Sequence, residues 1–150
     1  MHLETPHALK VEHDALHDTL RRATKEGGAL GTAAVTVAEL LHPHFVKEEA
    51  YALPPLGLLG ELARGPVAPE MKQVLTLTDR LKAELDEMVA EHQTIVAALA
   101  ELSAAAAEAG REEYVEFAAA LTLHAQAEEE VTYPAAILVG EYVRKGLETT

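Results

Sequence analysis

The chain has 150 residues, 49% of them hydrophobic and 25% charged, which is the composition of one globular domain. It contains no cysteine, which excludes disulfides, Cys-ligated zinc, iron–sulfur clusters and a thiol nucleophile. The formal net charge of −13 argues against nucleic acid and anionic membrane surfaces as partners, because both bind basic faces.

Apolar residues spaced three and four apart predict four helices. The first covers about residues 6–25 and ends near Gly27-Gly28. The second covers about residues 32–53, with a kink or an irregular start expected at Pro43. Residues 54–69 are rich in proline and glycine, which predicts a connecting loop with room for one short helical turn.

The third helix is expected over about residues 70–109, ending at Gly110, and the fourth over about residues 111–145, interrupted at Pro134. No alternating pattern predicts a strand. Four amphipathic helices with mostly short connections predict an all-α fold, an up-down-up-down four-helix bundle in a single domain over residues 1–150. The core stripe expected for the fourth helix consists of Phe117, Leu121, Val131, Leu138 and Tyr142.

Polar residues interrupt the apolar stripe of every predicted helix. A single histidine fills the gap in the first and third helices, and a histidine and a glutamate one turn apart do so in the second and fourth. A buried carboxylate or imidazole without a partner is costly, so matched polar residues in the core predict a shared cation. The candidate ligands are His13, His44, Glu48, His92, His124 and Glu128.

The same pattern is written twice along the chain. Glu12-His13 matches Glu91-His92, and the segment 44–49, His-x-x-x-Glu-Glu, matches 124–129 at nearly the same offset. This predicts an approximate internal two-fold repeat that places one His-x-x-x-Glu pair opposite the other. Nitrogen and carboxylate ligands together suit iron, manganese or zinc. Six ligands would saturate one ion, whereas two ions bridged by both carboxylates leave positions open, so the pattern favours two metals.

This ordered set of histidines and glutamates resembles the hemerythrin HHE cation-binding family over about residues 6–140. The resemblance implies a four-helix bundle around a non-haem, usually di-iron centre, bridged by the two carboxylates and an oxo or hydroxo group. It implies a small-molecule ligand: dioxygen, peroxide or nitric oxide. Any redox cycle would need an external reductant, since the chain has no cysteine for a rubredoxin-type centre of its own.

Two departures from the oxygen-carrying members bear on the ligand set. Those members have a His-x-x-x-His pair on the third helix, whereas Val96 stands four residues after His92. The first helix instead carries His13-x-x-x-His17, which makes His17 a further candidate ligand. The second departure is the fourth-helix carboxylate, which in those members is an Asp five residues after the histidine. Here it is assigned to Glu128, four residues after His124, with Glu129 as the alternative.

The remaining polar residues receive structural interpretations. We expect Tyr51 to pack in the core, and the histidines at 2, 7 and 42 to lie at the surface or at helix ends. We expect solvated faces for Glu12, Glu49, Glu129 and Glu130. A ferritin-like site is disfavoured, because the two Glu-x-x-His strings in the first half have no counterpart in the second.

The sequence therefore predicts a metal protein that binds or senses a small ligand. Two alternatives stay open: an enzyme that consumes peroxide or oxygen with an external donor, and a metal-stabilised helical interaction module. No apolar run reaches the length of a membrane span, and residues 1–6 lack a signal-peptide pattern, so we expect a soluble, cytoplasmic protein.

Overall fold

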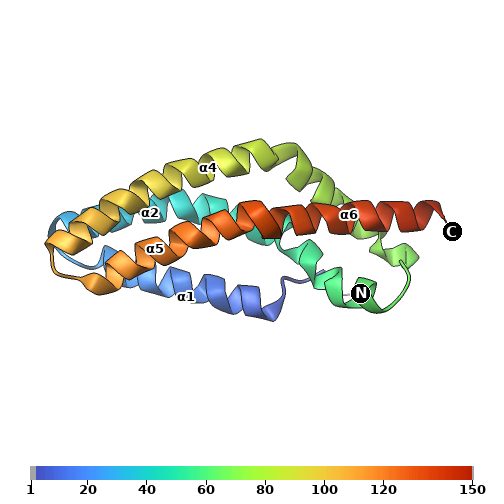
Figure 1. Ribbon diagram of the computed structural model, residues 1–150, viewed down its shortest axis with the longest axis horizontal. Coiled ribbons are helices and arrows are strands. Elements are labelled where there is room, and N and C mark those ends of the chain that lie inside the picture. The colour runs from blue at the N-terminus through green and yellow to red at the C-terminus, as the bar shows by residue number, and fades with distance from the viewer. Residues whose placement is uncertain (1–2, 150) are drawn as a thin grey trace.

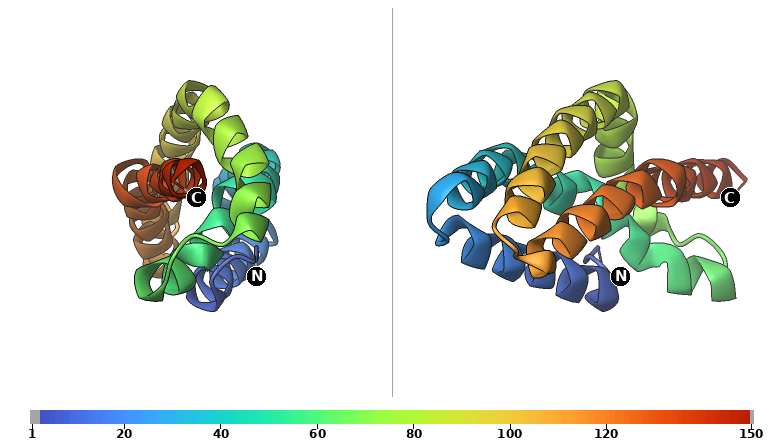
Figure 2. Two further views of the ribbon diagram at one scale, coloured as in Figure 1. Left: turned by 90° about the vertical axis from the view of Figure 1, so that its right-hand side faces the viewer. Right: turned by 60° about the vertical axis from the view of Figure 1, so that its left-hand side comes forward.

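The computed structural model describes residues 3–149, and the regular elements within that range are all helical (Figure 1). The long helices run alternately up and down, and neighbours pack as α1 on α2, α2 on α4, α4 on α5 and α5 on α1. The view along the bundle shows them around a common axis (Figure 2, left). The up-down-up-down bundle is confirmed. Its long helices are α1 (His7–Thr24), α2 (Gly28–Lys47), α4 (Val74–Glu108), α5 (Glu112–Ala127) and α6 (Tyr133–Glu148).

Glycines turn the chain at the shared end of both helical hairpins. Gly28, the first residue of α2, has a φ of +67°, and Gly110, between α4 and α5, has a φ of +70°. Residues that have a Cβ rarely adopt this left-handed backbone conformation, which explains the glycines at both turns. Both helix ends predicted at these glycines are confirmed, although α2 begins four residues earlier than expected.

The connection between α2 and α4 is more ordered than a loop. It contains the 3-10 helix η2 (Pro54–Leu58), the short helix α3 (Leu59–Arg64) and the 3-10 helix η3 (Pro69–Gln73). The apolar side chains of Leu56 and Leu58 are 6% and 0% exposed. Because η2 and η3 pack on α6, this connection covers the end of the bundle that the shorter α1 does not reach.

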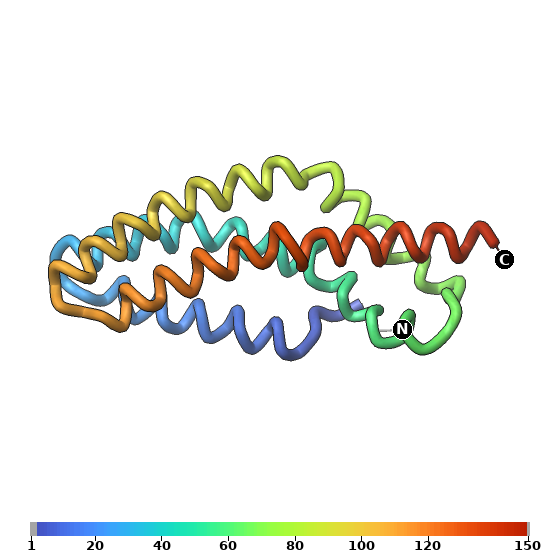
Figure 3. The backbone as a smooth tube through the Cα atoms, in the orientation of Figure 1, coloured from blue at the N-terminus to red at the C-terminus, as the bar shows by residue number. Residues whose placement is uncertain are grey.

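Two five-residue π-helices interrupt the long rods at corresponding places in the two halves. They are η1 (Glu48–Ala52), after α2, and η4 (Glu128–Thr132), between α5 and α6. Each is closed by a backbone bond to the carbonyl five residues back, from Leu53 to Glu48 and from Tyr133 to Glu128. The irregularity expected at Pro43 therefore lies further along, because the α-helix continues through that proline. Figure 3 shows α5, η4 and α6 as one continuous rod.

The π-helix η4 also overturns part of the predicted core. A π turn holds one residue more than an α turn, which rotates everything after it by about 100°. The core positions of α6 are consequently Val139 and Val143 rather than their neighbours one residue earlier. Three residues placed in the core stripe by their spacing are in fact 53% to 67% exposed: Val131, Leu138 and Tyr142.

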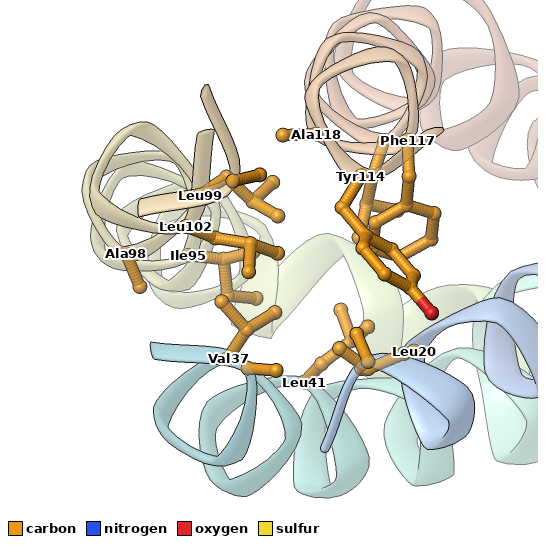
Figure 4. Close-up of a cluster of buried hydrophobic side chains, with 14 of the residues drawn as sticks. Leu20, Val37, Leu41, Ile95, Ala98, Leu99, Leu102, Tyr114, Phe117 and Ala118 are labelled. Atoms are coloured by element: carbon orange, nitrogen blue, oxygen red, sulfur yellow. The ribbon is translucent and has the colours of Figure 1, made fainter. Parts of the chain in front are cut away.

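A polar layer divides the hydrophobic core along the bundle axis. The larger cluster lies toward the glycine turns, where α2, α4 and α5 contribute residues such as Val37, Leu99 and Phe117 (Figure 4). A second cluster, including Leu53, Met88 and Tyr133, lies on the other side. The predicted metal ligands come between the two clusters: one histidine on each of α1, α2, α4 and α5, and one glutamate at the start of each π-helix. No helix within residues 3–149 has both the length and the apolarity to cross a membrane.

Candidate metal centre

Each of the four bundle helices brings one predicted ligand histidine into the polar layer. His13, His44 and His92 are at most 3% exposed. The side chain of His124 is 14% exposed. Both predicted glutamates open a π-helix, and Glu48 is 0% and Glu128 3% exposed. The four histidines lie on the apolar face of their helices, so their imidazoles point into the bundle together with the leucines of that face.

These six residues form two groups, in each of which the possible ligand atoms lie within 4.8 Å of one another. We call the first the inner position; it consists of His44, Glu48, His92 and Glu128. The second, the outer position, consists of His13, His124 and Glu128. Only Glu128 belongs to both.

The sequence predicts that Glu48 and Glu128 both bridge two ions, but only Glu128 is shared by the two groups of possible ligands. Glu128 approaches the outer histidines, 3.7 Å from His13 Nε2 and 3.3 Å from His124 Nε2, and also lies 3.2 Å from His92 Nε2. Glu48 stays on the inner side because its Oε2 accepts a hydrogen bond of 2.9 Å from the hydroxyl of Tyr133. Internal symmetry is therefore broken at the carboxylates.

The polar atoms of this layer fit a cation better than they fit one another. Within residues 3–149, buried atoms there without a hydrogen-bond partner include Glu48 Oε1, His124 Nε2 and Glu128 Oε2. Two ligand atoms about 2.1 Å from one ion, at right angles, lie about 3 Å apart. The 2.9 Å between His44 Nε2 and His92 Nε2 matches that spacing. The nitrogen and oxygen donors suit a first-row transition metal.

Burial sets the two carboxyl groups apart electrostatically. Burial and the neighbouring Glu128 raise the pKa of Glu48 well above its ordinary value. Burial would also raise the pKa of Glu128, but the neighbouring Glu48 and the histidines His124, His13 and His92 lower it far more. Without a cation, the surroundings therefore favour the neutral form of Glu48 and the charged form of Glu128.

The histidines follow the same logic. Burial and the facing His92 lower the pKa of His44, which keeps its ring neutral and ready to bind a metal. Burial lowers the pKa of His124 as well, but the carboxylates of Glu128 and Glu12 raise it on balance. The surroundings thus favour a neutral ring at His44 in the inner position, whereas His124 in the outer position is paired with negative charge.

Carboxylates on neighbouring helices reach the far nitrogen of three of the predicted ligand histidines. Glu91 Oε1 lies 3.3 Å from His44 Nδ1, Glu12 Oε1 lies 2.5 Å from His124 Nδ1, and Glu129 Oε2 lies 3.5 Å from His92 Nδ1. Such carboxylates fix the ring orientation of a ligand histidine and increase its basicity. Glu12 and Glu129, expected mainly on solvated faces, contact these histidines while remaining 51% and 33% exposed.

The fourth histidine lacks such a carboxylate and faces a surface pocket instead. His13 Nδ1 is buried and has no hydrogen-bond partner among residues 3–149. A pocket of about 500 Å³ is lined by His13, Glu49 and Leu53 among others. The outer position is consequently the one that communicates with solvent.

Tyr133 is a site residue that the sequence did not reveal. Its side chain is 0% exposed, and its hydroxyl lies 3.2 Å from both His44 Nε2 and His92 Nε2 as well as donating to Glu48. Burial and the neighbouring carboxyl groups of Glu48 and Glu128 raise the pKa of this phenol. The available signal was that Tyr133 follows Glu128 by five residues, directly before a proline, but only the π-helix turns that position inward.

The other residues singled out from the sequence lie away from the two positions. His17 contacts the ring of Phe45 edge-on, with centroids 4.5 Å apart, and lines a pocket between α1 and α2 together with His42. Its role as a ligand stays a prediction. His7 and His42 are exposed as expected, and His2 lies outside the described residues. The hydroxyl of Tyr51 bonds to Glu84, away from the polar layer.

A four-helix bundle with buried imidazoles and carboxylates converging on its axis defines a class of metal-binding bundle proteins. The profile of the hemerythrin HHE cation binding domain matches residues 4–136, and the chain belongs to this family. A search of curated proteins finds no match, and neither does a search of solved structures. Cation binding by this layer is thus supported by both the family and the geometry.

Proposed function

We propose that the protein holds two iron ions at the inner and outer positions and binds a small ligand there: dioxygen, peroxide or nitric oxide. The observation that carries this proposal is Glu128, whose carboxylate belongs to both ligand groups. A carboxylate that serves two groups bridges two ions. Manganese or zinc could occupy the same nitrogen and oxygen ligands.

The surroundings favour a ligand of very few atoms. A void of about 10 Å³ lies beside the polar layer, bounded by His44, His92, His124 and Glu128 and by apolar side chains. A space of that size holds about one water molecule. Ferrous iron would supply electrons to a ligand bound there, while the imidazoles hold the metal and the apolar wall excludes bulk water.

The test is metal analysis and absorption spectroscopy of protein loaded with iron. About two irons per chain, with a reversible spectral change on exposure to oxygen or nitric oxide, support the proposal. Peroxide consumption with an external donor, far faster than by free iron, would favour the enzyme instead. A protein that folds but retains zinc alone, or no metal, would favour an interaction module and overturn the iron proposal.

A further inference from the structure

Tyr133 makes the two metal positions chemically unequal. Its hydroxyl lies 2.9 Å from Glu48 Oε2 and 3.2 Å from the Nε2 atoms of both His44 and His92. Those three atoms are the inner position's own donors. The phenol oxygen therefore stands beside them as a further oxygen donor of the same kind.

The distances from the Tyr133 hydroxyl oxygen to the three donor atoms are those expected between adjacent ligands of one metal ion. Adjacent ligands of one octahedral ion lie about 3 Å apart. The hydroxyl of Tyr133 satisfies this separation with three donors at once, and its ring stacks on His92 with an interplanar angle of 18°. If the hydroxyl only donated a hydrogen bond to Glu48, it would not have to lie this close to the two histidines as well.

The equivalent place in the other half of the chain holds Leu53. Leu53 and Tyr133 are each the residue that follows a π-helix, and each donates its backbone N–H to the carbonyl of the ligand glutamate five residues earlier. Leu53 is 2% exposed and lines the pocket that contains His13. Where the inner position has a phenol oxygen, the outer position has an alkyl group and access to a pocket.

We propose that Tyr133 is a fifth protein ligand of the inner position, through its phenol oxygen, and that exogenous small molecules bind at the outer position. This inference rests on the proposed iron centre. Phenolate oxygen is a good ligand for ferric iron. On loading, the O–H bond of Tyr133 breaks, an O–Fe bond forms, and the proton passes to solvent, as metal binding to protonated ligands requires.

The direct test is the visible and resonance Raman spectrum of the full chain loaded with ferric iron. A ferric phenolate absorbs visible light and has characteristic ring vibrations, which we expect in the wild type. Tyr133→Phe should lose this absorption, whereas the control Tyr51→Phe should keep it, because Tyr51 is equally buried but bonds to Glu84.

A second test uses azide as the exogenous ligand. We expect ferric wild-type protein and Leu53→Phe to bind azide, and Leu53→Tyr to lose azide binding and gain phenolate absorption. Iron-loaded wild type without phenolate vibrations, or an unchanged band in Tyr133→Phe, overturns the inference and leaves the iron centre standing. Absence of bound iron in the wild type overturns the proposed function and the inference together.

Discussion

The Nε2 atoms of His44 and His92 lie 2.9 Å apart in the centre of the bundle, although 48 residues separate the two histidines in the sequence. Both rings are at most 3% exposed. Two imidazoles can share at most one hydrogen at this contact, and Glu48 Oε1 and Glu128 Oε2 beside it have no hydrogen-bond partner within residues 3–149. A cation between them satisfies both lone pairs, so metal affinity and the stability of this layer depend on the same contacts.

Replacing His44 should remove metal, whereas replacing its near neighbour His42 should not. His44→Ala deletes one of the two inner imidazoles, so we expect iron affinity to fall by about 100-fold or more. The rise in melting temperature on adding iron should disappear with it. His42→Ala is the matched control, because His42 is exposed on the same helix. Equal iron content in the two variants would contradict the assignment of His44.

Removing the charge of Glu48 should stabilise the metal-free protein while abolishing its metal binding. The pKa of Glu48 is raised in the folded state, so its favourable contribution is present below the unfolded value of about 4.5 and is lost as the pH rises through the raised folded value. We expect metal-free Glu48→Gln to exceed metal-free wild type by roughly 1–2 kcal/mol at pH 8 and to equal it at pH 4. Thermal unfolding in a chelator measures both. A less stable variant at pH 8 would contradict this reading.

The carboxylate behind His44 should tune the affinity without being a ligand. Lys47 Nζ lies 3.2 Å from Glu87 and 3.1 Å from Glu91, but only Glu91 reaches His44. Glu91→Gln weakens the orientation and basicity of the ring, so we expect a roughly 10- to 100-fold loss of iron affinity. Competition with a chelator measures this loss. Glu87→Gln controls for the lost partner of Lys47 and should leave the affinity unchanged; a loss of similar size there would assign the effect to Lys47.

The contact between α4 and α6 should not tolerate a side chain at Gly140. A Cβ at this position would lie 2.1 Å from Thr78 Oγ1 and 2.6 Å from Thr78 Cβ. We expect Gly140→Ala to lower the free energy of unfolding by about 1–3 kcal/mol in a urea titration. In Gly60→Ala the new Cβ meets only the flexible end of Arg64, 3.0 Å away, so the change should stay within about 0.5 kcal/mol. Equal effects of the two substitutions would contradict a tight α4–α6 contact.

The residues that could be predicted are those whose position depends on local helical spacing alone. His13 and His92 were found because each fills a gap in a regular stripe, and the bundle followed from the stripes. Tyr133 was missed, and Leu138 and Tyr142 were wrongly placed in the core, because the π-helix advances the register by one residue. Extrapolating an apolar stripe assumes a constant number of residues per helical turn. The extra residue in the π-helix breaks that assumption, so the stripe was extended to the wrong residues of α6.

The contacts of Glu12 and Glu91 with histidines could not be predicted from the spacing within one helix. Glu12-His13 and Glu91-His92 were visible as a repeated string, but each glutamate serves a histidine on another helix, Glu12 that of α5 and Glu91 that of α2. Such pairings depend on which helices are neighbours and on their axial offset. The sequence shows that the Glu-His string occurs twice, and only the packing of the helices shows which histidine each glutamate contacts.

Of the long helices, α1 has the fewest buried residues, so it is the one expected to open most easily. Only three residues of this helix are buried, His13, Leu20 and Ala23, whereas α4 runs the whole length of the bundle. Opening of α1 alone costs far less free energy than global unfolding, and it removes an imidazole from the outer position and the carboxylate of Glu12 from His124. The rate of amide hydrogen exchange in α1 therefore sets an upper bound on how long an ion at the outer position would keep all of its protein ligands.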